Sequence, residues 1–208
     1  MRKKILILTK SAKRRHDGIN HGYCVAGIFQ NINGGYQWIR LVADEEGDSL
    51  PEGSFLFEPL DVIEADICPC PKNNHIENYT FSNPRKIGRI EDNQLKTIFK
   101  KLSHSFFGNM SNIYDGRPNN SLTILLATNL RIYREDNGAG PSKIDFKMGN
   151  NTARGVAMTD YKYMPKKYSN EIKTIPLAIC IASLPNHPPY YKFIASIFPI
   201  VSYNQNSL

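Results

Sequence analysis

Residues 23–42 read YCVAGIFQNINGGYQWIRLV, and this stretch decides the fold. Two apolar runs, residues 23–29 and 37–42, flank residues 31–35, in which every residue except Ile32 is asparagine or glycine. These residue types accept the positive φ angles that tight hairpin turns require. The stretch therefore predicts a β-hairpin, in which Ile39 and Leu41 face the core while Trp38 and Arg40 share the other face.

Short apolar runs continue on both sides of this hairpin. Residues 4–9 predict a strand that ends in a polar, basic loop at residues 10–18. Prolines bound a strand-like segment at residues 55–68, and residues 79–81 and 86–87 have the composition of short strands. A second β region is predicted from residues 122–127, 130–133, 144–148, 152–160, 175–184 and 191–200.

One segment has helical periodicity. Leu95, Ile98, Phe99 and Leu102 form a single apolar stripe, which predicts a helix over residues 91–102. Residues 110–120 are polar and predict a linker. A mainly β chain with one or two helices follows, and two tandem small β-barrels fit this layout better than one sandwich. The expected boundaries are residues 1–109 for the first barrel with its C-terminal helix and 121–208 for the second.

The 208-residue chain has a net charge of +7 and 41% hydrophobic residues, which is typical of a globular protein with a basic surface. The charge indicates either solubility through self-repulsion or a polyanionic partner. The first fifteen residues contain seven Lys or Arg and no acid. The sequence shows no signal peptide, no membrane-length apolar run and no disulfide framework among its four cysteines, so we expect a cytoplasmic protein without membrane contact.

Three motifs resemble the bacterial dual OB-containing domain family. They are ILILTKS at residues 5–11, YCVAGI at 23–28 and WIRLV at 38–42, and residues 158–160 and 191–195 fit the family's second half. The chain departs from the family pattern at Leu41, where proline is expected. The resemblance implies two tandem OB folds and nucleic-acid binding, often beside bacterial defence genes. It carries over no catalytic residue.

The basic segment has two interpretations. A basic loop beside an OB barrel can hold backbone phosphates, or it can simply be solvated. Trp38, with Tyr36 and Tyr23, offers rings on which bases can stack, and Arg40 lies on the same strand face as Trp38. The alternative is a buried tryptophan beside an arginine that holds a carboxylate such as Asp44.

Other candidates have weaker patterns. Asp160 can bind a sugar hydroxyl or cap a turn, and Lys192 can line a groove or extend past apolar neighbours.

Zinc ligands are usually separated by two to four residues, so the Cys-x-Cys pair with a nearby histidine favours free thiols over a metal site. This pattern comprises Cys68, Cys70 and His75. Asp61, Glu64 and Asp66 form a cluster of carboxylates. Such a cluster can hold Mg²⁺ in a nuclease, but the lysine pattern that accompanies a nuclease core is missing here.

No catalytic motif and no cofactor fingerprint occurs in the sequence. We therefore expect a non-catalytic module that binds nucleic acid, with single strands or RNA favoured, or a nucleotide. The alternatives are a nucleotide sensor or enzyme with a pocket between the barrels, and a scaffold subunit for a protein partner. The predicted contact residues are Lys10, Ser11, Lys13, Arg14, Arg15, Tyr23, Trp38, Arg40, Asp160 and Lys192.

Overall fold

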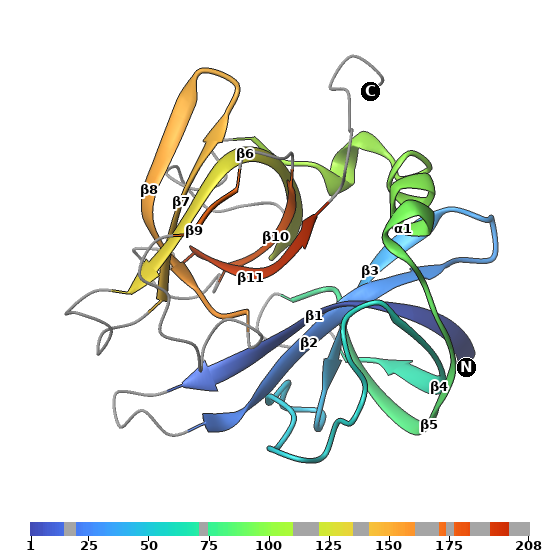
Figure 1. Cartoon of the computed structure of the whole chain (residues 1–208). Coiled ribbons are helices and arrows are strands. Elements are labelled where there is room, and N and C mark those ends of the chain that lie inside the picture. Colours follow the sequence, from blue (N-terminus) through green and yellow to red (C-terminus); the bar gives the residue numbers. More distant parts are fainter. Residues whose placement is uncertain are drawn as a thin grey trace. The chain divides into compact units, whose positions relative to one another are not determined.

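The computed structural model describes two compact units, Met1–Leu95 and Lys96–Leu208 (Figure 1). Each unit has its own β-sheet and its own hydrophobic core. The described residues are 1–14, 20–70, 75–109, 121–134, 142–160, 171–173, 177–183 and 192–199. The predicted linker at residues 110–120 lies outside them.

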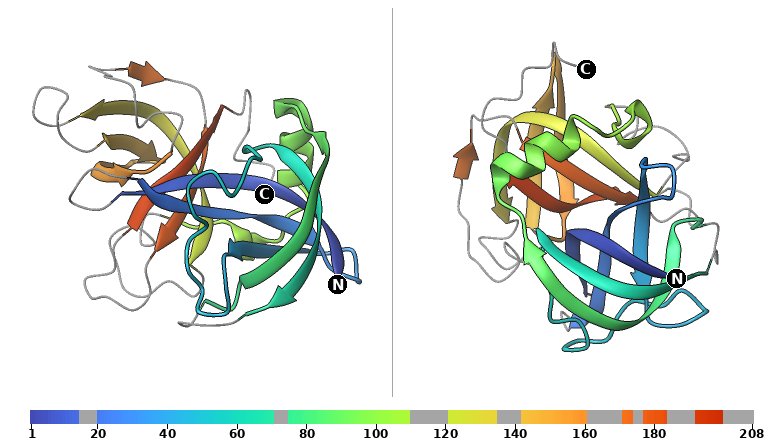
Figure 2. Two further views of the ribbon diagram at one scale, coloured as in Figure 1. Left: turned by 90° about the horizontal axis from the view of Figure 1, so that it is seen from below. Right: turned by 90° about the vertical axis from the view of Figure 1, so that its right-hand side faces the viewer.

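The first unit is a closed barrel with the strand order β1-β2-β3-β5-β4 (Figure 2). Its strands are β1 (Arg2–Arg14), β2 (Asn20–Gln30), β3 (Tyr36–Val42), β4 (Asp61–Pro69) and β5 (Asn78–Arg89). Neighbours are antiparallel except β3 and β5, whose parallel contact completes the ring. This five-stranded arrangement is an OB-like barrel, as the sequence predicted.

The predicted hairpin is confirmed as β2 and β3. Asn31 Oδ1 accepts hydrogen bonds from the backbone N–H groups of Asn33 and Gly35, which fixes the turn. Ile39 and Leu41 are buried in the barrel core, as strand alternation predicted. Phe55, from the connection between β3 and β4, packs into the same core.

Two expectations for the first strand and its loop are wrong. Residues 10–14 belong to β1, which continues beyond the predicted end at residue 9. Their polar side chains suggested a loop, but backbone pairing with β2 continues from Lys10 to Arg14. The long β1–β2 ladder supplies the hydrogen bonds that a solvated loop would have obtained from water.

Strand boundaries in the second half of this barrel also differ from the prediction. β4 begins at Asp61 rather than residue 55, and Leu60 has a positive φ of 76° that ends the preceding loop. The two predicted short strands are one strand, β5, although it contains Pro84. Asn83 and Pro84 lie opposite Ala65 in a bulge, where the missing proline N–H costs no ladder bond.

The predicted helix is present but shorter. α1 spans Asp92–Phe99, and a 3-10 helix, η1, spans His104–Phe106. Leu95 and Phe99 are fully buried, as their shared stripe predicted. The N–H groups of residues 101 and 102 bond three residues back rather than four, so the chain tightens and the helix ends.

The second unit repeats the strand order of the first. Its strands are β6 (Leu122–Arg134), β7 (Ser142–Met148), β8 (Asn151–Met158), β9 (Glu171–Lys173), β10 (Leu177–Ser183) and β11 (Lys192–Pro199). Pairing runs β6-β7-β8-β11-β10 and returns to β6, with β9 added beside β6. The β8–β11 contact is parallel, which matches the β3–β5 contact of the first barrel.

The second core is lined by side chains from every long strand whose side chains are described. They include Leu125, Ile132, Ile144, Phe146, Val156 and Ile194. The two strands predicted at residues 122–127 and 130–133 are a single strand, β6, with Asn129 at a positive φ of 53°. The strands predicted at residues 144–148 and 152–160 are present as β7 and β8, which pair as antiparallel neighbours.

Among the described residues, no helix has both the length and the hydrophobicity that a bilayer span requires.

Candidate functional site

Lys10 lies near the end of the first barrel, where a bulge in β1 redirects its side chain. Ile5 and Ile7 face the core, and the register shift between Ile7 and Thr9 then places Lys10 opposite the core residue Val25. The backbone N–H of Ala26 donates to Thr9 Oγ1 at 3.1 Å across this irregularity. A bulge shifts the in–out alternation by one residue, so Lys10 turns inward and is 6% exposed.

Contacts with Glu58 and Tyr23 hold the Lys10 ammonium group within this unit. Its Nζ donates to Glu58 Oε1 at 2.9 Å and lies 4.9 Å from the centre of the Tyr23 ring. A cation over an aromatic ring is attracted by the negative face of the ring. The structure therefore brings two predicted contact residues together, with Tyr23 half-buried beside the lysine.

The other members of the basic segment are placed less completely. Ser11 is buried and lies opposite Cys24 on β2. Lys13 and Arg14 are the last residues of β1, where only the backbone is described. Arg15 lies outside the described residues.

Trp38 and Arg40 share the outer face of β3 and both are half-buried. Arg40 Nη2 lies 3.6 Å from Glu77 Oε1, and its Nη1 lies 3.4 Å from Nε2 of His75. The carboxylate beside Arg40 is thus Glu77. Asp44 instead accepts hydrogen bonds from the backbone N–H groups of Glu46 and Asp48.

The Glu77 carboxylate lies in a buried, charged cluster. Burial by itself raises the pKa of Glu77, but the hydrogen bond from His75 and the charge of Arg40 outweigh it and hold the pKa below its usual value. The His75 ring contacts both charged groups, with Nδ1 3.3 Å from the Glu77 carboxylate and Nε2 3.4 Å from Nη1 of Arg40. The cluster fixes the β4–β5 connection to β3, since Arg40 N also donates to Glu77 O at 2.7 Å.

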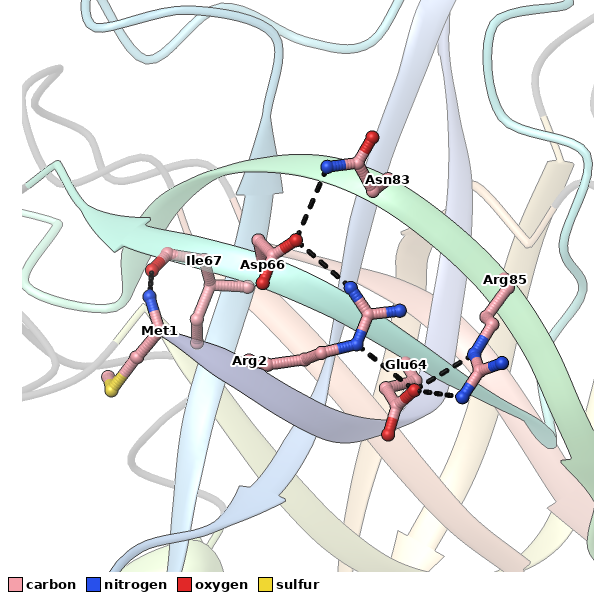
Figure 3. Close-up of polar contacts among 7 residues, drawn as sticks. All are labelled: Met1, Arg2, Glu64, Asp66, Ile67, Asn83 and Arg85. Atoms are coloured by element: carbon pink, nitrogen blue, oxygen red, sulfur yellow. Dashed lines mark hydrogen bonds and ion pairs between the residues drawn. The ribbon is translucent and has the colours of Figure 1, made fainter.

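The β4 carboxylates are covered by basic side chains from both neighbouring strands (Figure 3). Glu64 Oε2 accepts hydrogen bonds from Arg2 Nε at 3.1 Å and from Arg85 Nη2 at 2.6 Å. Asp66 Oδ2 accepts from Arg2 Nη1 at 3.0 Å and from Asn83 Nδ2 at 3.3 Å. Hydrogen bonds from Arg85 and then Arg2 lower the pKa of Glu64. These contacts make the carboxylates part of a charge ladder across β1, β4 and β5.

Asp61 completes this ladder at the start of β4. Its Oδ1 accepts hydrogen bonds from Lys86 Nζ at 2.6 Å and Arg89 Nη1 at 2.8 Å. Burial raises the pKa of Asp61, but hydrogen bonds from Lys86, the Glu58 backbone and Arg89 outweigh burial and leave the pKa lowered. The three carboxylates are therefore bound by cations of the chain itself.

The cysteine and histidine residues near the end of β4 have separate environments. Cys70 is buried and its Sγ donates to the Glu45 carbonyl at 3.0 Å, whereas Cys68 is exposed. His75 contacts Glu77 and Arg40 through its two ring nitrogens. Within the part of the chain that the structure describes, no three metal-ligating side chains gather at one point.

In the second unit, Asp160 lies two residues after the end of β8 and is 1% exposed. Its Oδ2 accepts a hydrogen bond from the backbone N–H of Ile197 at 3.1 Å, and Thr159 N donates to Ile194 O at 2.8 Å. These bonds tie β8 to β11. Lys192, the first residue of β11, is half-buried opposite Ser183.

Sequence reasoning missed one surface, the outer face of β6, β7 and β8. Residues on these strands that alternate with the core residues include two aligned pairs, Arg131 with Asp145 and Tyr133 with Lys143. Lys147 lies further along β7, and Arg154 lies on β8. We call this surface the β6–β8 face and define it by Arg131, Tyr133, Lys143, Asp145, Lys147 and Arg154. It has four cationic side chains and one carboxylate.

The shape of the β6–β8 face depends on a bulge in β8. Arg154 and Gly155 lie opposite the single residue Asp145, and Gly155 has a positive φ of 63°. Asp145 Oδ1 accepts hydrogen bonds from Gly155 N at 2.8 Å and from the Tyr133 hydroxyl at 3.2 Å. Asp145, the one carboxylate of the face, thus orients the ring of Tyr133. Apolar and polar residues alternate around Ile132 and Ile144 in the strands predicted at residues 130–133 and 144–148, and this alternation was the signal that could have found the face.

A family model described as the dual OB-containing domain matches residues 3–197. The match reaches every strand that the structure describes. No curated protein and no solved structure matches the chain.

Proposed function

The chain belongs to the dual OB-containing domain family, and from that premise we propose that it binds single-stranded nucleic acid as a non-catalytic module. The observation that carries the proposal is the ring order, which is the same in both units. OB barrels bind oligonucleotides or oligosaccharides on the face of their early strands. The net charge of +7 favours an oligonucleotide over an oligosaccharide, because each phosphate that a cation of the protein neutralises releases a counterion.

The paired carboxylates support a binding role over phosphodiester hydrolysis. A nuclease needs carboxylates that can hold a metal ion, whereas Asp61, Glu64 and Asp66 are bound by arginine, lysine and asparagine side chains. We extend the proposal to a larger bacterial system, of the defence type that the family resemblance implies, in which a partner chain supplies any catalysis.

Fluorescence anisotropy of the full chain with labelled single-stranded DNA and RNA, at about 50 and 200 mM salt, tests the proposal. We expect log K to fall by roughly 0.7 per contacted phosphate for each tenfold rise in salt. Absence of binding at the lower salt concentration overturns the proposal. Equal affinity for a heparin oligosaccharide also overturns it, because charge alone would then explain the binding.

A further inference from the structure

The corresponding faces of the two barrels differ in their chemistry. In the shared ring order, β6, β7 and β8 correspond to β1, β2 and β3. On the first barrel, the outward residues Leu6, Ala26 and Ile28 of β1 and β2 are apolar and at most 7% exposed. The β3 residues aligned with Ile28 and Ala26 are the half-buried Trp38 and Arg40, and Arg40 is paired with Glu77. On the second barrel, the corresponding strands carry Arg131, Lys147 and Arg154, all of them exposed.

An arginine lies over an aromatic ring on the β6–β8 face. The guanidinium carbon of Arg131 lies 5.2 Å from the centre of the Tyr133 ring. The hydroxyl of Tyr133 is held by Asp145 at 3.2 Å, so the orientation of the ring is set before any ligand arrives. Bases stack on aromatic rings and on guanidinium planes, and unpaired bases expose the flat surfaces that such stacking needs.

The other cations of the face lie along the same strands. Lys143 and Lys147 are both on β7 and four positions apart, so they point to the same side, about 13 Å from each other along the strand. Arg154 lies at the bulge of the neighbouring strand. This spacing allows the cations to contact different phosphates of one strand.

We infer that the β6–β8 face of the second barrel is the surface that contacts single-stranded nucleic acid. Arg131 and Tyr133 stack on a base, and Lys143, Lys147 and Arg154 bind the phosphates around it. The inference rests on the proposed function and assigns its site to the second unit, whereas the basic segment at the amino end directs Lys10 toward Glu58.

The test measures the affinity of full-length variants for labelled oligo(dT) and oligo(U) of about 15 nucleotides. Lys147→Glu reverses an exposed charge on the face and is expected to weaken binding about tenfold, with a smaller salt slope. Tyr133→Leu removes the ring and is expected to weaken binding by roughly five- to tenfold. Tyr133→Phe keeps the ring, so we expect its affinity to stay within about twofold of wild type.

Lys100→Glu is the matched control for charge, because Lys100 is exposed in the same unit but follows α1 rather than lying on the face. Its affinity is expected to stay within about twofold of wild type. If the wild type binds and Lys147→Glu binds equally well, the site assignment is wrong while the proposed function stands. If the wild type does not bind, the proposed function itself fails. Circular dichroism identifies a variant that does not fold; should Tyr133→Leu be one, Lys147→Glu decides alone.

Discussion

Gly27 lies on β2 where the backbone of β1 leaves no room for a side chain. A Cβ atom at this position would lie 2.1 Å from the carbonyl oxygen of Leu6 and 3.2 Å from the Cα of Ile7. Gly27 lies opposite Ile7, directly before the bulge that turns Lys10 inward. The absence of a side chain here therefore allows the strand register on which the position of Lys10 depends.

Gly27→Ala is expected to destabilise the protein by about 1–3 kcal/mol, because backbone atoms must separate to admit the methyl group. Denaturant-induced unfolding followed by circular dichroism measures the loss. Gly88→Ala is the matched control, since a Cβ there has no heavy atom within 4 Å. A Gly27→Ala variant that unfolds at the wild-type midpoint would contradict the close approach of the two strands.

The contact between Lys10 and Glu58 gives a second prediction. Lys10→Met keeps the length of the side chain but removes its charge, and a double-mutant cycle with Glu58→Gln isolates the pairwise energy. We expect a coupling of about 1 kcal/mol, reduced by the partial exposure of Glu58. The more exposed pair of Arg85 and Glu64 should show a smaller coupling in the same assay. A coupling energy of zero would contradict the contact between the Lys10 ammonium group and the Glu58 carboxylate.

Side-chain direction was predictable from sequence only where strands are regular. Period-two alternation correctly directed Ile39 and Leu41 into the core. The same rule fails after Ile7, because a bulge shifts the alternation and the residues around it, Leu8 and Thr9, are ordinary strand formers. The partners of Lys10 and Arg40 are Glu58 and Glu77, which are distant in sequence, so only the folded barrel reveals them.

At the scale of elements, β4 is held by charges on both sides. Arg2 on β1 and Arg85 on β5 reach the same Glu64 carboxylate, and Asp61 receives Lys86 and Arg89 from β5. The folded protein therefore keeps these carboxylates ionised more strongly than the unfolded chain does. Because the folded pKa values are lowered, this contribution to stability is present above the unfolded values and is lost as the pH falls.

We expect the free energy of unfolding to decrease as the pH falls below about 4.5. The decrease should continue until the pH has passed the lowered pKa values of Asp61, Glu64 and Glu77. Glu64→Gln cannot take up that proton on unfolding, so its stability should depend less steeply on pH in this range. Glu52→Gln, at an exposed position outside the ladder, should follow the wild type. Denaturant midpoints measured from pH 6 to about pH 3 provide the comparison, and identical slopes for Glu64→Gln and wild type would contradict it.

Element boundaries were predictable only where turn chemistry is plain. Asparagine and glycine mark the β2–β3 turn correctly. By contrast, β5 contains Pro84 and β6 contains Asn129, two residue types that indicate a break in a strand. Both lie in bulges of continuous strands, which is where a sheet tolerates an absent donor or a positive φ. A single sequence does not distinguish such a bulge from a turn.

At the scale of the whole molecule, one topology occurs twice with two different surfaces. Both rings close through a parallel pair, β3 with β5 and β8 with β11. The class of fold was therefore predictable from strand number and turn spacing, together with the family motifs. The proposed site was harder to predict, because charge density along the sequence is highest at residues 1–15, whereas the β6–β8 face assembles its cations from three separate strands.

Ligand binding to this face should appear as a gain in stability of the whole protein. An oligonucleotide at about 100 times its dissociation constant is expected to raise the free energy of unfolding by roughly 2.7 kcal/mol, provided that it binds the folded state alone. At the same oligonucleotide concentration, Lys147→Glu should gain about half as much. If the variant binds tenfold more weakly, that concentration is only about ten times its dissociation constant. Lys100→Glu should gain as much as wild type. Raising the salt must reduce the gain in wild type, since phosphate contacts release counterions; a gain that is insensitive to salt would mean that the cations of the face do not bind the strand.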